Sequence, residues 1–275
     1  MIKKDRSGIR KILAVFSAFI ILSIFAYAAS DDEPMPLESL NATENERINV
    51  SQIPLKSHDA EAGNLTKLVL FGRSQTKHWQ GYYGDITGTI TLDDAQNWTL
   101  YDWDNPEPKG EIYAVANTSG TTPSWSTVEC FNYTQETAGA AWANGNTTLD
   151  RWETYYNMTW NDVDGINETF NVTTHLGFSV GSYTIDADSC PATYTYVSDA
   201  YQQDKFSEIL LQTDEAQLVF ATIIENDDEA NNTDPTGFDD VAHDFQMLVA
   251  EDGTSLSAGE INEDPTTYYF YIDIE

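Results

Sequence analysis

Hydrophobic and polar positions alternate in short runs over most of the chain after residue 64. Residues 86–92 (ITGTITL) alternate apolar side chains or glycine with threonine, and residues 98–103 (WTLYDW) follow the turn-forming residues 93–96. A period of two is typical of a β-strand with one buried and one solvated face. The two runs therefore predict a β-hairpin.

Further short strands are expected from the same alternation and from short apolar runs. They fall at residues 65–71, 111–116, 125–131, 170–180, 183–186, 193–197, 208–212, 217–224, 245–249 and 268–274. Within the last run, one face carries Tyr268, Phe270, Ile272 and Ile274. Only residues 149–156 favour a helix. Consecutive short strands joined by turns predict an all-β domain over residues 64–275, an antiparallel β-sandwich of about ten strands.

Three tryptophans lie in or beside the predicted hairpin, at Trp79, Trp98 and Trp103. Aromatic side chains are common in strands, where they pack across neighbouring strands and between sheets. We therefore expect these rings to belong to the core. The alternative is a platform for sugars, which requires rings left exposed on one face.

The N-terminus has the pattern of a secretory signal. Residues 1–11 hold five basic side chains, residues 12–25 form an apolar run, and Ala26-Tyr27-Ala28 follow. This order predicts a signal peptide, expected to be helical, over residues 1–28. An uncleaved membrane anchor is the alternative, because residues 12–29 approach the length of a membrane span. Both place the remainder of the chain outside the cytoplasm, extracellular or at the cell surface.

Residues 29–63 are polar and lack aromatic side chains and any period, which predicts a flexible acidic arm or stalk. A short alternating piece within it places Ile48 and Val50 on one face. The segment is either a spacer or an arm that adds a strand to a neighbouring subunit.

The chain is strongly acidic, with a formal net charge of -32 from 13 Lys and Arg against 45 Asp and Glu. Such a surface repels nucleic acid, since phosphate binding needs basic side chains. No nucleic-acid partner is therefore expected, and a membrane contact only through an uncleaved leader. Most of these charges are expected to be a solvated surface that suits salt or divalent cations.

Covalent modification is indicated by two residue types. The two cysteines, Cys130 and Cys190, are expected to form a disulfide outside the cytoplasm, with two buried free thiols as the alternative. Asparagine occurs in N-x-S/T far more often than chance predicts, which indicates a glycosylating compartment. The sequons are Asn41, Asn49, Asn64, Asn97, Asn117, Asn132, Asn146, Asn157, Asn167, Asn171 and Asn231.

No motif predicts catalysis. Residues 177–181 match G-x-S-x-G around Ser179, but a strand-like run follows where the hydrolase motif needs a helix. Residues 74–77 match S-x-x-K without its companion motifs. The histidines never occur at zinc-ligand spacing; they are His58, His78, His175 and His243. We therefore expect no enzyme.

Calcium is the cofactor that remains open, since hard oxygen ligands on a flexible loop suit this ion. Residues 225–240 hold seven carboxylates, and the candidate ligands are Asp227, Asp228, Asp239 and Asp240. A solvated acidic loop is the simpler interpretation. Residues 162–167 resemble part of a helix-loop-helix calcium loop, but Trp160 stands where its first ligand belongs.

Several phrases together resemble a group of uncharacterised secreted proteins from uncultivated archaea with small genomes. These are WQGYYG, TGTITLDD, TLYDW, GEIYA, YTYV, EILL, DFQMLV and TTYYFYIDIE, within residues 68–275. The resemblance implies archaeal origin, export and a surface setting, and it carries over no catalytic or binding residue.

The function expected from these features is structural. A glycosylated, acidic, disulfide-bonded β-domain without a catalytic set suits a subunit of an extracellular filament or envelope layer, a homo-oligomer or polymer carrying covalent glycans. The alternative is a carbohydrate-binding or adhesion module that uses surface aromatics. A secreted hydrolase built from unremarkable residues is the third possibility.

Overall fold

The computed structural model describes residues 33–43, 56–71, 76, 78–96, 98–105, 108–116, 122–136, 145–181, 183–197, 200–202, 205–214, 217–225, 235–252 and 266–274. The predicted signal peptide lies outside these residues, as do residues 44–55 of the predicted arm and the candidate ligands Asp227 and Asp228.

The described residues are organised around one antiparallel sheet. It contains β1 (Met35–Pro36), β15 (Tyr268–Ile274), β5 (Gly110–Ala116), β13 (Leu218–Ile223), β12 (Glu208–Gln212) and β6 (Glu129–Cys130), in that order, and β9 (Ala192–Thr193) also pairs with β12. The central strands β5, β12 and β13 are buried almost throughout. Continuous apolar runs such as EILLQ and LVFATI suit strands that are covered on both faces.

Each face of the sheet carries its own hydrophobic core. On one face, Leu218 and Phe220 pack with Met247 and Val249. The covering elements are β2 (Trp79–Gly84) paired with β14 (Phe245–Ala250), and the helices α2 (Thr148–Tyr155) and α3 (Ile166–Thr169). On the other face, Val219 packs in a cluster with residues of β7 (Phe178–Val180), β8 (Tyr183–Ile185) and the 3-10 helix η2 (Trp125–Thr127).

Helix α2 begins at a capping box. The Thr147 side chain accepts a hydrogen bond from the backbone N–H of Asp150, and the Asp150 carboxylate accepts one from the backbone N–H of Thr147. The far end is fixed to the core by Tyr156, whose hydroxyl lies 2.8 Å from that of Tyr268. Since the Tyr268 hydroxyl donates to the carbonyl oxygen of Ala250, Tyr156 donates to Tyr268. This confirms the helix expected at residues 149–156, whereas α3 and η2 were not expected.

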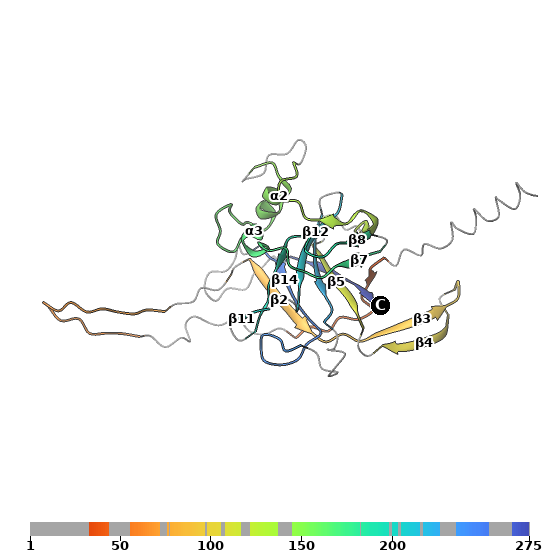
Figure 1. Cartoon of the computed structure of the whole chain (residues 1–275), viewed down its shortest axis with the longest axis horizontal. Helices are drawn as coiled ribbons and strands as arrows, with labels where there is room; N and C mark the ends of the chain where they lie inside the picture. The colour runs from red at the N-terminus through yellow and green to blue at the C-terminus, as the bar shows by residue number, and fades with distance from the viewer. Residues whose placement is uncertain are drawn as a thin grey trace, which may run out of the picture.

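Two elements project from the body at opposite ends of the long axis (Figure 1). One is a ribbon of β3 (Gly88–Asp93) and β4 (Thr99–Asn105), which form a two-stranded sheet of their own. The other is residues 56–71, which are extended and turn at residues 62–63. A smaller ribbon, β10 (Tyr196–Val197) with β11 (Ala200–Tyr201), completes the described strands.

The mostly β, antiparallel prediction is confirmed. Hairpins are found at β3–β4 and β12–β13, and strands at β5, β8, β14 and β15 where the alternation placed them. Strand pairing alone does not establish a two-sheet sandwich, because the described strands form one seven-stranded and four two-stranded sheets. The strand expected at residues 65–71 was wrong, since this exposed segment is assigned no strand. The predicted long strand at residues 170–180 is reduced to β7.

Part of the predicted arm adds a strand to the sheet of its own chain. Met35 pairs with Ile272 and Pro36 with Tyr271, so β1 covers the edge of β15. Proline suits this position, because it cannot donate to a further strand and an edge strand needs no such donor. The alternating piece around Ile48 and Val50 lies outside the described residues.

Candidate functional sites

The predicted disulfide is present and joins the central sheet to the loop that follows β8. Cys130 of β6 and Cys190 lie with their Cα atoms 4.9 Å apart, within the normal range for a bridge. Cys190 belongs to the core on the face covered by β7 and β8.

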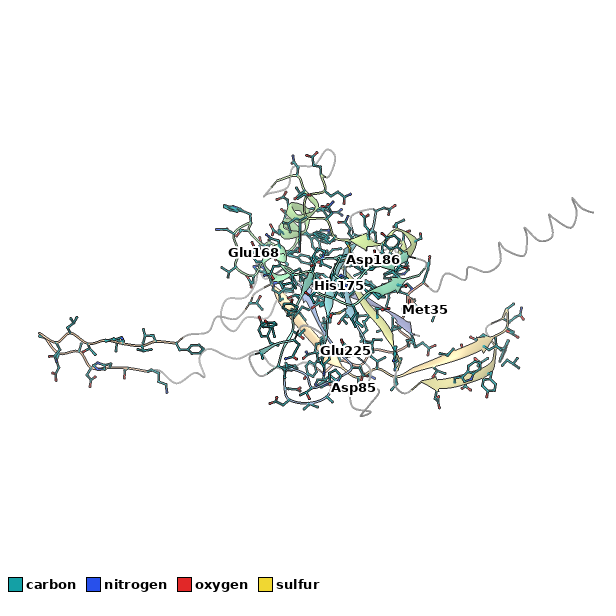
Figure 2. All side chains as sticks on the ribbon, in the orientation of Figure 1. Met35, Asp85, Glu168, His175, Asp186 and Glu225 are labelled. Carbon is teal, nitrogen blue, oxygen red and sulfur yellow. A yellow bond between two sulfur atoms is a disulfide. The ribbon has the colours of Figure 1, made fainter. Side chains whose placement is uncertain are left out.

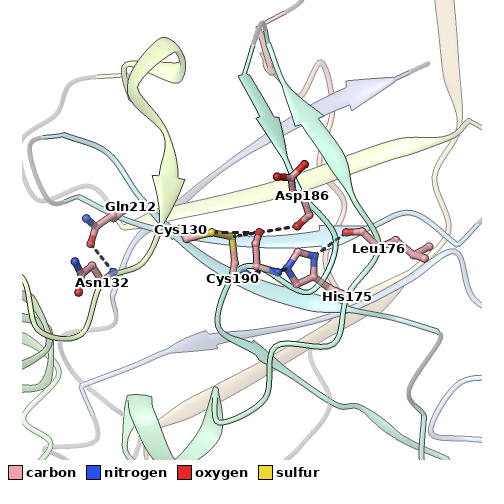
Figure 3. Close-up of a disulfide and its surroundings, with 8 residues drawn as sticks. Cys130, Asn132, His175, Leu176, Asp186, Cys190 and Gln212 are labelled. Atoms are coloured by element: carbon pink, nitrogen blue, oxygen red, sulfur yellow. Dashed lines mark hydrogen bonds between the residues drawn. A yellow bond between two sulfur atoms is a disulfide. The ribbon is translucent and has the colours of Figure 1, made fainter.

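His175 organises the backbone next to this disulfide (Figure 3). Its Nε2 accepts hydrogen bonds from the backbone N–H of Ser189 at 3.1 Å and of Cys190 at 3.0 Å. The proton therefore lies on Nδ1, which donates to the carbonyl oxygen of Leu176 at 2.6 Å. The ring is buried. Its role in the structure is to satisfy two backbone donors, and no sequence pattern predicted this role.

Ser179 of the G-x-S-x-G match lies within β7, and β8 follows it as a hairpin. A strand-to-helix turn, which the hydrolase motif needs, is therefore absent at this position. Within the described residues no serine hydroxyl makes a hydrogen bond to a histidine ring. Ser74, Gln75 and Lys77 of the S-x-x-K match lie outside them.

His243 lies between two carboxylates beside β14. Its Nε2 is 3.0 Å from Oδ1 of Asp239, and its Nδ1 is 3.7 Å from Oδ1 of Asp85. The ring also contacts Tyr83, whose ring packs against Phe238 with centroids 4.8 Å apart. Asp239 additionally accepts from the backbone N–H of Val241, so it closes the turn before β14.

The calcium prediction is tested only in part. Asp239 is engaged with His243, and Asp240 has a positive φ of 62° in the same turn. No group of three or more His, Cys, Asp or Glu side chains positioned to hold a metal occurs in the part of the chain that the structure describes. The calcium site therefore stays a prediction that depends on Asp227 and Asp228.

Asp162, from the second acidic motif, is part of a tight turn. Its carboxylate accepts from the backbone N–H of Thr159 at 2.6 Å and from the Thr159 hydroxyl at 2.8 Å. The backbone hydrogen bond from Thr159 is the main reason that the pKa of Asp162 is lowered. His78 lies 3.8 Å away and adds a smaller effect in the same direction.

Glu208 is a fully buried acid that the sequence prediction missed. It begins β12, pairs with Thr222 and Thr193, and its side chain lies on the face that β14 covers. Neither carboxyl oxygen makes a hydrogen bond of normal geometry among the described residues. Burial raises the pKa of the Glu208 carboxyl well above its ordinary value, and the backbone N–H of Leu248 only partly offsets this.

The sequons differ in exposure. Asn167, at the start of α3, is half-buried and its side-chain oxygen is inaccessible. Four sequons lie outside the described residues: Asn49, Asn97, Asn117 and Asn231. The other six asparagines are exposed: Asn41, Asn64, Asn132, Asn146, Asn157 and Asn171.

The three tryptophans separate into two groups. Trp79 packs on the core, with its ring centroid 5.7 Å from that of Phe170. The core prediction was wrong for Trp98 and Trp103, whose exposed fractions are 74% and 49%. These two belong to the projecting β3–β4 ribbon, which the body of the molecule does not cover (Figure 2).

The ribbon has one apolar face and one polar face. Ile90 pairs with Trp103 and Leu92 with Tyr101, so these four exposed side chains share a face. The rings of Tyr101 and Trp103 lie 4.5 Å apart. The other face carries Thr89, Thr91, Asp102 and Asp104. We name the first set the ribbon's apolar face.

Comparisons with protein-family models, with curated protein sequences and with solved structures gave no match. None of the helices in the described residues combines the length and the apolar character needed to span a membrane.

Proposed function

We propose that this chain is a structural glycoprotein of the archaeal cell surface, a subunit of an extracellular filament or envelope layer. The observation that carries the proposal is the ribbon's apolar face, which stays exposed although the body has complete cores on both sides of its central sheet. A two-stranded sheet is marginally stable alone in water, and exposed apolar surface of this kind typically marks a protein–protein contact. Eleven sequons and the disulfide support an exported setting.

The architecture proposed for the body is a β-sandwich. Its second layer would be the β2–β14 pair, whose Met247 and Val249 pack on the central sheet together with Trp79. This layer gives the subunit a rigid body from which the ribbon projects. A rigid body with projecting contact elements suits a repeating assembly.

Concentration-dependent sedimentation and negative-stain microscopy of the full, secreted and glycosylated chain test the proposal. The expected result is growth of the sedimentation coefficient with concentration, and regular fibres or a lattice in the images. A monomer at every concentration, with no regular particles in native material, would contradict it.

A carbohydrate-binding or adhesion module is the second candidate, and exposed rings favour it. Tyr101 and Trp103 are neighbours on the ribbon, and the rings of Tyr194 and Tyr201 stack with centroids 5.3 Å apart. Rings of this kind offer faces for sugars. Quenching or enhancement of tryptophan fluorescence by soluble oligosaccharides, lost on Trp103→Ala, is the result expected for this function. No spectral change up to millimolar sugar would exclude it.

A further inference from the structure

Residues 65–70, within the projecting segment 56–71, form a second exposed apolar element. Leu68, Val69 and Leu70 have exposed fractions of 56%, 88% and 85%. No strand of the described structure pairs with this segment. A short run of high β-propensity without proline, left extended and exposed, readily adds to the edge of a sheet.

The β3–β4 ribbon offers a strand edge with which residues 65–70 could pair. Its sheet contains only two strands, so β4 has one open edge beside its apolar face. The side chains of an added strand would alternate between the two faces of the ribbon. If Leu68 and Leu70 join the apolar face, Lys67 falls on the polar face.

Charge favours this register. Lys67 is exposed and is one of eight basic residues that follow residue 28. The polar face of β4 carries Asp102 and Asp104, both exposed. Opposite charges at neighbouring positions of adjacent strands are stabilising. An anionic lipid surface is disfavoured as the partner by the same two aspartates.

The two elements lie at opposite ends of the long axis of the molecule (Figure 1). Each chain therefore carries a strand donor, residues 65–70, and a strand acceptor, the open edge of β4, which point away from each other. A contact between unlike surfaces repeats head to tail and yields an open polymer when the rotation does not close.

We propose that residues 65–70 of one copy add as a third strand to the open edge of β4 in a second copy of this chain. Leu68 and Leu70 cover the apolar face beside Tyr101 and Trp103, and Lys67 meets Asp102 and Asp104. This inference rests on the proposed function, because it names the junction of the same assembly.

Complementation of two broken variants of the full secreted chain tests the junction. The donor variant is Leu68→Asp with Leu70→Asp, and the acceptor variant is Ile90→Asp with Trp103→Asp. Each is expected to raise the concentration for half-assembly about 100-fold or more. Mixed in equal amounts, they are expected to give dimers and nothing larger, since each pair retains one intact donor and one intact acceptor.

The matched control is Val163→Asp with Leu176→Asp, which adds the same charge at two exposed apolar positions outside both elements. It is expected to assemble as the wild type does. A charge exchange tests the register of the added strand. Lys67→Glu is expected to raise the concentration for half-assembly about 3- to 10-fold, and a second copy with Asp102→Lys and Asp104→Lys is expected to restore it.

Several outcomes would overturn the inference. If the wild type assembles and the donor and acceptor variants assemble equally well, the junction is wrong while the proposed function stands. If the wild type stays monomeric at all concentrations, both are wrong. Unchanged assembly with loss of binding to zwitterionic lipid vesicles or to a soluble polysaccharide would assign the apolar face to that partner instead.

A crosslinking experiment tests the same junction without the aspartate substitutions, so it does not depend on whether those variants fold. A photo-crosslinking amino acid at Val69 of the otherwise unchanged chain is expected to link to residues 99–105 of another copy, as mapped with mixed isotope labels. Links confined to the same chain, or to other surfaces, would overturn the inference.

Discussion

Glu208→Gln is expected to stabilise the protein at neutral pH, because it removes an acid whose charge the core cannot hold. Glu208 is fully buried on the face that β14 covers, and burial raises the pKa of its carboxyl well above the ordinary value. Glutamine keeps nearly the same shape and stays neutral at every pH. The substitution therefore isolates the cost of protonation from the cost of packing.

The sign follows from proton linkage. Below pH about 4.3, the ordinary pKa of glutamate, Glu208 is protonated in both the folded and the unfolded chain. It then contributes nothing to the pH dependence of the free energy of unfolding. As pH rises above that value, the unfolded chain loses the proton while the folded chain keeps it. The free energy of unfolding then falls with pH until the raised folded pKa is reached.

The ceiling of this effect is the cost of keeping an ordinary carboxyl protonated. At pH 7 it is about 3.7 kcal/mol, taking 1.36 kcal/mol for each pH unit above about 4.3. For a domain of this size, each kcal/mol shifts the melting temperature by about 2–4 °C. Glu208→Gln is thus expected to raise the melting temperature at pH 7 by up to about 15 °C, and by much less at pH 4.

Melting curves of the wild type and the variant from pH 4 to pH 8, at constant ionic strength, measure the effect. Glu38→Gln is the control, because it makes the same substitution at an exposed position outside both projecting elements. It is expected to leave the pH slope as in the wild type. A Glu208→Gln variant whose melting temperature runs parallel to that of the wild type across this range would refute the argument.

Three further predictions concern other parts of the chain. His175→Leu leaves the backbone N–H groups of Ser189 and Cys190 without an acceptor and is expected to lower the free energy of unfolding by about 2–5 kcal/mol in urea titrations, whereas exposed His58→Leu leaves it unchanged. Glycopeptide mass spectrometry of native material is expected to find the exposed sequons modified and Asn167 bare; full occupancy at Asn167 would count against accessibility as the determinant. Millimolar Ca²⁺ at fixed ionic strength is expected to raise the melting temperature, with the gain lost when the four candidate ligands become Asn; identical curves in chelator would exclude the site.

Sequence patterns predicted the elements whose side chains pack on a hydrophobic core. In β15 the alternation of Tyr268, Phe270 and Ile272 against Tyr271 assigned the two faces correctly, because each face meets a different core. The turn between β12 and β13 was visible from its polar residues. The disulfide followed from the cysteine count.

The pattern failed where the environment of a residue depends on other segments. Alternation in β3 and β4 predicted an amphipathic hairpin, and that hairpin exists, but no period tells whether anything covers the apolar face. Trp103 was therefore expected in the core and is exposed. Glu208 is the opposite case. A glutamate at the start of a strand is ordinarily solvated, and only the position of β14 makes it buried.

The acidic surface and the projecting elements are connected by the physics of self-association. A net charge of -32 makes close contact between two bodies of this protein unfavourable. At physiological ionic strength such repulsion is largely screened beyond about 8 Å. A junction made by a segment at one end and a ribbon at the other separates the bodies, so the apolar contact forms where few like charges meet. The proposed junction would also place Lys67 opposite Asp102 and Asp104. An acidic subunit of this shape can therefore be soluble as a single chain and still polymerise through its ends.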